Sequence, residues 1–283
     1  MSNYNYNARY KEEVAKFTKK DGLIAICYFA YIVVMGFAFS FFFNYSQMAQ
    51  QLSGRVLHVI LNYISPVLYV APVFIIVFIK KQGLSSVGFH KKDLKSVLLL
   101  CLALFALTQM MWSGLFIGSI QGGHFLPFNV VTELIIIVLI AAAWEDIVFS
   151  GFIQPRLHGI FKNNIVAVFI GALFFAFMHM PVFFVAINLS PLDALLSDSF
   201  IVWIISHVLF NLVFRKHFSI FPVIAIHAFM NLASRGGEMW ESGVTSLDTL
   251  APFPISYIIM AVAVILWAIY QNRKSRKTLH ELD

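Results

Sequence analysis

The chain has 283 residues, of which 60% are hydrophobic and only 12% charged, and its mean hydropathy is +0.81. Soluble domains are typically about 45–50% apolar and about 25% charged, so this composition excludes an ordinary soluble domain. The net charge of +6 comes from basic residues in short segments beside apolar runs. Such residues orient membrane helices, and we therefore expect a lipid bilayer and no nucleic acid as partner.

Repeated apolar runs of about 20 residues predict an all-α fold, a polytopic membrane helix bundle with about eight transmembrane helices. The predicted spans are, in chain order, Leu23–Phe43, Leu57–Ile79, Val97–Ile117, Val130–Phe152, Ile165–Val185, Phe200–Phe214, Ile220–Ala233 and Pro254–Tyr270. We expect a single integral membrane domain over 1–283, with tails at 1–22 and 271–283 and a motif-bearing core at 130–233.

The connections between these spans alternate in charge. Both tails and every second connection are rich in lysine and arginine, whereas the intervening connections carry few basic residues. Basic residues favour the cytoplasmic side of a membrane. The alternation predicts a multi-pass protein of the cell (plasma) membrane with both termini in the cytoplasm.

The fourth span contains two adjacent acids, Glu145 and Asp146, with apolar sequence on both sides. A charged residue at the centre of a membrane helix costs roughly 2.5–3.5 kcal/mol on insertion scales. Two such acids need polar partners, and an ionisable residue in this setting is by default a functional-site hypothesis.

Polar residues in later spans supply candidate partners. His179 follows Phe175 by four residues in the fifth span, and Asn231 follows His227 by four in the seventh. This spacing stacks two side chains on one helix face. Counting about 1.5 Å of rise per residue puts Glu145 and His227 at similar depth, whereas His179 comes out higher in the membrane.

The three stretches EDIVFSG (145–151), FAFMH (175–179) and HAFMN (227–231) resemble the motifs of the CAAX protease and bacteriocin-processing (CPBP, also Abi) family of intramembrane proteases. The motifs of that family are E-E-x-x-x-R-G, F-x-x-x-H and H-x-x-x-N, in this order and on separate helices. The resemblance covers the chain from about 130 to 233.

The resemblance implies that Glu145 activates a water for attack on a peptide carbonyl and that His179 helps to hold this water. His227 and Asn231 would stabilise the tetrahedral oxyanion. Without the family, a carboxylate in a low-dielectric cavity is still a suitable base, and a side-chain amide is a suitable oxyanion donor. Glu145, His179 and His227 would also make a two-histidine, one-carboxylate zinc set, so zinc is possible, although the resemblance favours a mechanism without metal.

Two positions depart from the family pattern: Asp146 replaces the second glutamate, and Ser150 replaces the arginine. Positions four apart face each other on a helix, so both halves of an expected ion pair have changed. We expect Asp146, Ser150 and Phe175 to support the catalytic residues. Without the guanidinium, Asp146 should be largely protonated or hydrogen-bonded to Ser150.

Three functions remain open at this point. The first is an intramembrane endopeptidase that cleaves a peptide or a membrane-associated precursor. The second is a catalytically degenerate relative that acts as a bacteriocin-immunity factor or as a scaffold for partner membrane proteins. The third is a small transporter that uses Glu145 and the histidines as a proton relay, which the absence of an evident internal repeat disfavours.

Overall fold

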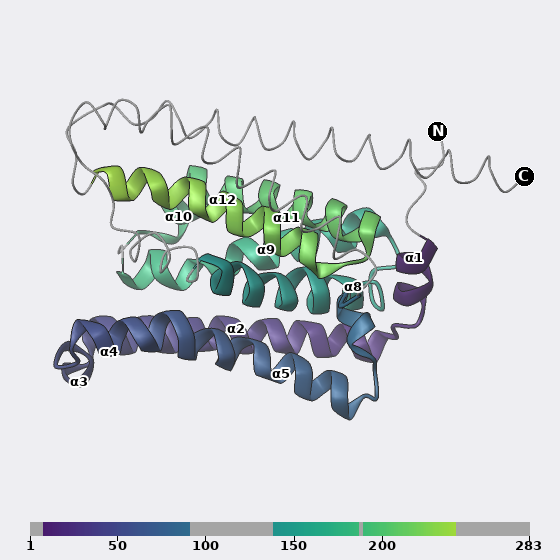
Figure 1. Cartoon of the computed structure of the whole chain (residues 1–283), viewed down its shortest axis with the longest axis horizontal. Helices are drawn as coiled ribbons and strands as arrows, with labels where there is room; N and C mark the ends of the chain where they lie inside the picture. The colour runs from purple at the N-terminus through teal and green to yellow at the C-terminus, as the bar shows by residue number, and fades with distance from the viewer. Residues whose placement is uncertain (1–7, 91–137, 187–188, 242–283) are drawn as a thin grey trace, which may run out of the picture. The chain divides into compact units, whose positions relative to one another are not determined.

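The computed structural model describes residues 8–90, 138–186 and 189–241, and every regular element within these ranges is helical. The elements are α1 (Ala8–Ala15), α2 (Lys19–Tyr45), α3 (Gln47–Gln50), α4 (Gly54–Val59), η1 (Ile60–Ile64), α5 (Ser65–Ile79), η2 (Leu84–Val87), η4 (Ile147–Ile153), α8 (Gln154–Leu157), α9 (Asn164–Met178), η5 (Val182–Ala186), α10 (Pro191–Leu195), α11 (Asp198–His217) and α12 (Ile220–Glu241) (Figure 1). The prediction of an all-α fold is confirmed.

Five helical stretches are long and apolar enough to cross a membrane: Lys19–Tyr45, Ile60–Ile79, Val138–Leu157, Asn164–Val185 and Pro191–His217. The protein is thus a multi-pass membrane protein. These stretches overlap the first, second, fourth, fifth and sixth predicted spans, and the shorter apolar helix Ile220–Asn231 overlaps the seventh. The predicted spans Val97–Ile117 and Pro254–Tyr270 lie outside the described residues, so the count of eight is not confirmed.

The chain divides into two compact units, Met1–Leu100 with Leu139–His227, and Cys101–Val138 with Ala228–Asp283. Most of the second unit lies outside the described residues. The elements from α1 to α11 and the start of α12 belong to the first unit. The organisation as one integral membrane domain stays a prediction.

The first long helix begins at a capping box. The Thr18 side chain accepts from the Asp21 backbone, and the Asp21 carboxylate accepts from the Thr18 backbone. This reciprocal arrangement satisfies two of the free N–H groups at a helix start. Asp21 also forms an ion pair with Lys80 at 2.9 Å, so the start of α2 is joined to the end of α5.

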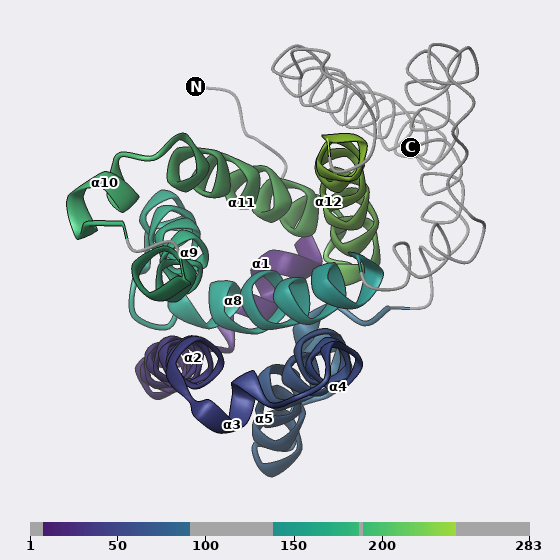
Figure 2. The same cartoon turned by 90° about the vertical axis from the view of Figure 1, so that its left-hand side faces the viewer.

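The core of the first unit lies where α2, α5, η4 and α9 meet (Figure 2). It is built from aliphatic and aromatic side chains that are almost completely buried, including Tyr28, Val73, Phe152 and Phe175. The Tyr28 hydroxyl donates a hydrogen bond to the Tyr69 carbonyl, which satisfies a polar atom within this core. On the other side of α9, α11 packs along it, as the view in Figure 2 shows.

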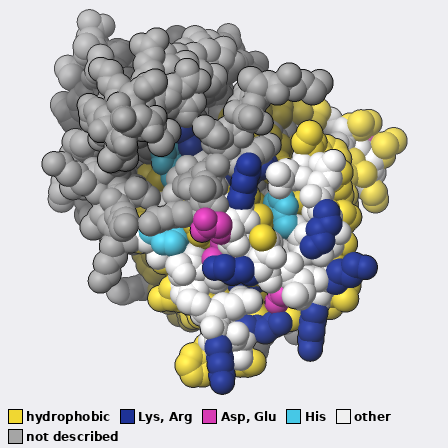
Figure 3. Space-filling view, turned by 90° about the vertical axis from the view of Figure 1, so that its right-hand side faces the viewer, with side chains coloured by type: hydrophobic (Ala, Val, Ile, Leu, Met, Phe, Trp, Pro, Cys, Tyr) yellow, Lys and Arg dark blue, Asp and Glu magenta, His cyan; other side chains and the backbone are white. Residues whose placement is uncertain are grey.

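Basic side chains gather on the face of Figure 3, and we name this face the basic end. It carries α1, the turn after α5, the turn between α8 and α9, and the end of α11. Arg156 lies buried here, with its guanidinium 3.9 Å from the centre of the Phe152 ring. It donates hydrogen bonds to the Phe152 carbonyl and to the Gln82 side chain, which joins the turn after α5 to the helix that carries the acid pair.

Candidate active site

The acid pair lies at a change of helix type. The span Val138–Leu157 is α-helical up to Asp146 and continues as the π-helical segment η4 from Ile147. π-Helical turns inside α-helices are rare and often occur at functional sites. Glu145 and Asp146 are therefore the last two residues before the irregular segment, and they point to different environments: the Glu145 side chain is 13% exposed and the Asp146 side chain 0%.

His227 faces both acids. Its Nε2 lies 3.6 Å from Glu145 Oε2, and its Nδ1 lies 3.2 Å from Asp146 Oδ2. The two ring nitrogens of one imidazole thus meet two carboxylates that are adjacent in sequence but differ in burial. The buried Asp146 orients the ring, as a carboxylate does for a histidine in many catalytic and metal sites. Glu145 is the more exposed of the two carboxylates.

This arrangement adds a partner for Asp146. The sequence predicted a protonated carboxyl group or a hydrogen bond to Ser150, because the arginine of the motif is absent. The structure gives Asp146 a further partner that lies 81 residues away in sequence, His227. The Ser150 side chain is buried, and the protonation of Asp146 or its hydrogen bond to Ser150 stays a prediction.

Phe175 lies at the centre of the histidine cluster. Its ring stacks on His207 at 4.6 Å between centroids, and it meets His179 at 5.1 Å and His227 at 5.9 Å with its plane tilted steeply to theirs. The ring is 2% exposed. Phe175 therefore packs against three imidazoles from three helices. This packing explains why an aromatic ring occupies the first position of the F-x-x-x-H stretch.

His179 ends α9 and is held on two sides. Its Nδ1 lies 3.0 Å from the Phe175 carbonyl, and its ring stacks on Trp203 of α11 with centroids 4.0 Å apart. Trp203 was missed by the sequence analysis, which did not single it out within the predicted span Phe200–Phe214. The role of His179 in holding water stays a prediction.

Asn231 lies on α12 four residues after His227, as the sequence predicted. It belongs to the second unit. Its part in oxyanion binding stays a prediction.

The zinc alternative needs Glu145, His179 and His227 to converge on one point. Within the described residues there is no group of three or more histidine, cysteine, aspartate or glutamate side chains placed to hold a metal ion. His179 is instead turned toward Trp203 and the Phe175 carbonyl. These three side chains thus do not form a preassembled metal site in the described part of the chain, and zinc stays a possibility raised by the sequence alone.

Gly151, the glycine of the first motif, permits a close approach of two backbones. A Cβ atom at this position would lie 2.8 Å from the Val87 carbonyl oxygen of η2, nearer than such atoms approach in proteins. Backbone cannot move aside as a flexible side chain can, so the glycine lets η2 pack against the helix of the acid pair.

We expect Gly151→Ala to lower the melting temperature in detergent, with an overpacking cost of about 1–3 kcal/mol. The matched control is Gly83→Ala, where the nearest atom to an added Cβ is the rotatable Ser85 Oγ at 3.2 Å. Thermal unfolding of both variants tests this. Equal melting temperatures for Gly151→Ala and the wild type would contradict the packing explanation.

Comparison with known proteins adds one finding. Residues 127–233 match the family model described as Type II CAAX prenyl endopeptidase Rce1-like. This range contains all three motif stretches and confirms the resemblance to the CAAX protease family. No curated protein and no solved structure matches the chain.

Proposed function

We propose that this multi-pass protein, whose residues 127–233 match the Rce1-like type II CAAX prenyl endopeptidases, is an intramembrane endopeptidase that uses Glu145 as its general base. The family match suggests a protease of the CAAX type. The observation that carries the assignment of the base is the geometry around His227, which faces Glu145 with one ring nitrogen and Asp146 with the other.

In this proposal Glu145 accepts a proton from a water molecule as the water attacks the peptide carbonyl. A carboxylate can serve as general base when it is within hydrogen-bond reach of the water, and its exposed fraction of 13% leaves it accessible. The peptide carbonyl carbon becomes tetrahedral and its oxygen gains negative charge. The proton taken by Glu145 then goes to the leaving amine, which completes hydrolysis.

His227 and Asn231 are proposed to stabilise the developing oxyanion, and His179 to position the water. Asp146 fixes the orientation of the His227 ring through Nδ1, which leaves the Nε2 side directed to Glu145 and the reacting groups. A preorganised donor aimed at an oxyanion is typically worth about 2.7–4 kcal/mol of transition-state stabilisation. Phe175 and Trp203 keep the imidazole rings from rotating away.

The substrate in this proposal is a peptide or a membrane-associated precursor, cleaved near the cytoplasmic face of the plasma membrane. The gathering of lysine and arginine at the basic end supports placing that end in the cytoplasm, with both termini on the same side. Partner membrane proteins and a role in bacteriocin immunity or peptide processing belong to this proposal as further expectations.

The runner-up is a non-catalytic relative that acts as an immunity factor or scaffold. The presence of Ser150 in place of the arginine of the motif favours it. The ring of His227 between two carboxylates favours the enzyme, since a scaffold has no need for a costly intramembrane acid pair.

Purified protein in lipid nanodiscs, incubated with a library of membrane-proximal peptides and analysed by mass spectrometry, tests the proposal. We expect discrete cleavage products that are absent from the Glu145→Gln variant. If a cellular phenotype of the protein survives Glu145→Gln at unchanged protein levels, proteolysis is not its function and the scaffold alternative is favoured.

A further inference from the structure

Two neighbouring helices carry buried polar side chains at intervals of four residues. The span with the acid pair carries Asp146, Ser150 and Gln154, and α11 carries His207 and Asn211. Each of these side chains belongs to a residue that is 0% exposed. The spacing of four brings His207 and Asn211 near one face of α11.

Contacts near both ends of these sets relate the two helices. Toward the acid pair, the His207 ring lies 6.0 Å from the Phe149 ring. Toward the basic end, the guanidinium of Arg215 lies 5.5 Å from the ring of Tyr10, whose hydroxyl lies 3.0 Å from His158 Nε2. From Phe149 to His158 and from His207 to Arg215 the two stretches thus run in the same direction, toward the basic end.

Gln154 and Asn211 lie between these two ends, each on its own helix. Gln154 Oε1 packs directly on Gly171 of α9, where an added Cβ would collide with it. His207 stacks on Phe175, one turn further along α9. The polar side chains thus border one region between the acid-pair span, α9 and α11, which we name the polar column; it is defined by Ser150, Gln154, His207 and Asn211.

Most polar atoms of the column lack protein partners. Among the described residues, no hydrogen bond reaches either amide atom of Gln154 and Asn211, or either ring nitrogen of His207. An unsatisfied buried polar group costs about 1–3 kcal/mol, and several together approach the whole net stability of a protein, about 5–15 kcal/mol. Buried polar groups without protein partners are as a rule bonded to ordered water.

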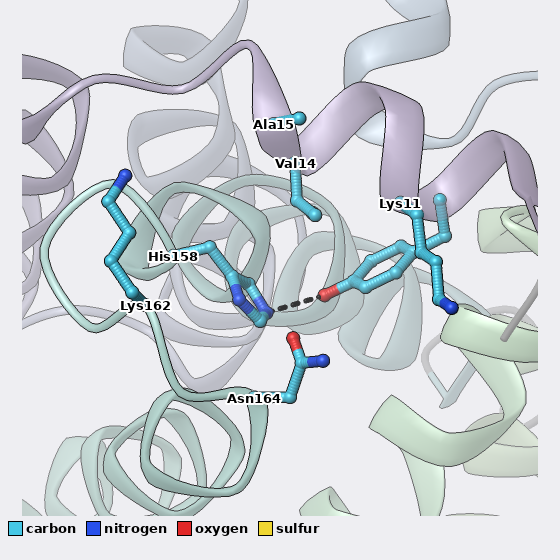
Figure 4. A pocket seen from close by; sticks show the side chains of 7 residues that line it. Lys11, Val14, Ala15, His158, Lys162 and Asn164 are labelled. Atoms are coloured by element: carbon cyan, nitrogen blue, oxygen red, sulfur yellow. Dashed lines mark hydrogen bonds between the residues drawn. The ribbon is translucent and has the colours of Figure 1, made fainter. Parts of the chain in front are cut away.

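A pocket lies at the basic end (Figure 4), and one of its lining residues, His158, follows Gln154 by four residues in the sequence. The pocket has a volume of about 220 Å³, and its lining includes Tyr10, Lys11, His158, Lys162 and Asn164. Since one water occupies about 30 Å³ of liquid volume, the pocket holds several. At its opposite end the column meets Asp146, the partner of His227.

His158, which lines the pocket, does not titrate near neutral pH. Burial, together with the positive charges of Arg215 and Lys162, lowers the pKa of His158 to about 4. The ring is therefore neutral above this pH, and its Nε2 accepts the hydrogen bond from the Tyr10 hydroxyl. The wall of the pocket thus presents a neutral hydrogen-bonded pair.

We propose that the polar column is hydrated and conducts water from the pocket at the basic end to the acid pair. The hydration stands on the buried polar groups alone. The further statement that Glu145 activates this conducted water rests on the proposed function. A hydrolase enclosed by lipid and apolar side chains needs such a supply, and the column provides polar groups at roughly one-turn intervals for it.

Hydroxyl-radical labelling by X-ray radiolysis of water, read by mass spectrometry on protein in nanodiscs, tests the hydration. Side chains next to internal water become oxidised, whereas dry core side chains are protected. We expect oxidation of His207 and Phe149, although both are 0% exposed, and its loss in Asn211→Leu. If Asn211→Leu fails to fold, Gln154→Leu is used as a second variant. The matched control is Asn44→Leu, at an exposed position of α2, which should keep the labelling of His207 and Phe149.

The same labelling in Glu145→Gln separates this inference from the proposed function, because internal water is expected whether or not peptides are cleaved. Protection of His207 and Phe149 in the wild type would overturn the hydrated column and leave the protease proposal intact. If the column is labelled but Asn211→Leu and Gln154→Leu cleave peptides at the wild-type rate, the column does not supply the reacting water. Slower cleavage by both variants at unchanged KM is the result that supports the supply.

Discussion

Replacing Glu145 with glutamine is expected to reduce kcat/KM for peptide cleavage by about 100- to 10,000-fold, the usual contribution of a positioned general base. Glutamine keeps the size of the side chain and a hydrogen-bonding oxygen but does not accept a proton at neutral pH. The variant should retain its fold, because the Glu145 side chain is partly exposed and 3.6 Å from its His227 partner.

The matched control for this prediction is Glu13→Gln, which makes the same chemical change in α1 at an ion pair with Lys16. Its cleavage rate should equal that of the wild type. Rates are compared at equal protein concentration in nanodiscs, after thermal unfolding has established that both variants are folded. A Glu145→Gln variant within a few-fold of the wild-type rate would exclude Glu145 as the base.

Removing His227 is expected to destabilise the protein as well as to abolish cleavage. In His227→Leu the carboxylate of Asp146, which is 0% exposed, loses its partner. Breaking a buried ion pair in this way typically costs about 3–5 kcal/mol. Thermal unfolding in detergent should show a clear decrease in melting temperature, and no cleavage products should form.

Adding Asp146→Leu to the His227→Leu variant should restore most of the stability that His227→Leu loses, without restoring cleavage activity. When both members of a buried pair become apolar, no uncompensated charge remains in the core. Asp146→Leu alone completes the double-mutant cycle. A double variant that is no more stable than His227→Leu would mean that Asp146 and His227 are not energetically coupled.

The long apolar helices were predictable because hydrophobic length is a local property of the sequence. The predicted spans Leu23–Phe43 and Ile165–Val185 fall within the observed Lys19–Tyr45 and Asn164–Val185, and capping residues account for the difference at the starts. The sixth span was predicted too short, as α11 extends from Asp198 to His217. Its polar ends, including the caps and the basic last turn, gave no hydrophobic signal.

The pairing within the site was less predictable because it depends on tertiary geometry. Residue counting from the membrane edges put Glu145 and His227 at a similar depth, and these two side chains do meet. The same counting placed His179 too high, since it assumes straight helices perpendicular to the membrane. The structure instead relates His179 to His227 through the ring of Phe175.

The polar column escaped the sequence analysis for a different reason. His207, Asn211 and Gln154 are single polar residues in apolar surroundings. Such residues are more often bonded across helices, and their lack of protein partners emerges only when the packing of the acid-pair span, α9 and α11 is known.

Hydrolysis in water enriched in ¹⁸O tests the central claim most directly. The wild-type protein and Glu145→Gln are incubated in nanodiscs with the same membrane-proximal peptides, and the new C-terminal carboxylates are weighed by mass spectrometry. The account predicts products from the wild type with ¹⁸O incorporated at the cleaved carbonyl, and no such products from Glu145→Gln. Equal amounts of labelled product from both proteins would contradict a role for Glu145 in activating water.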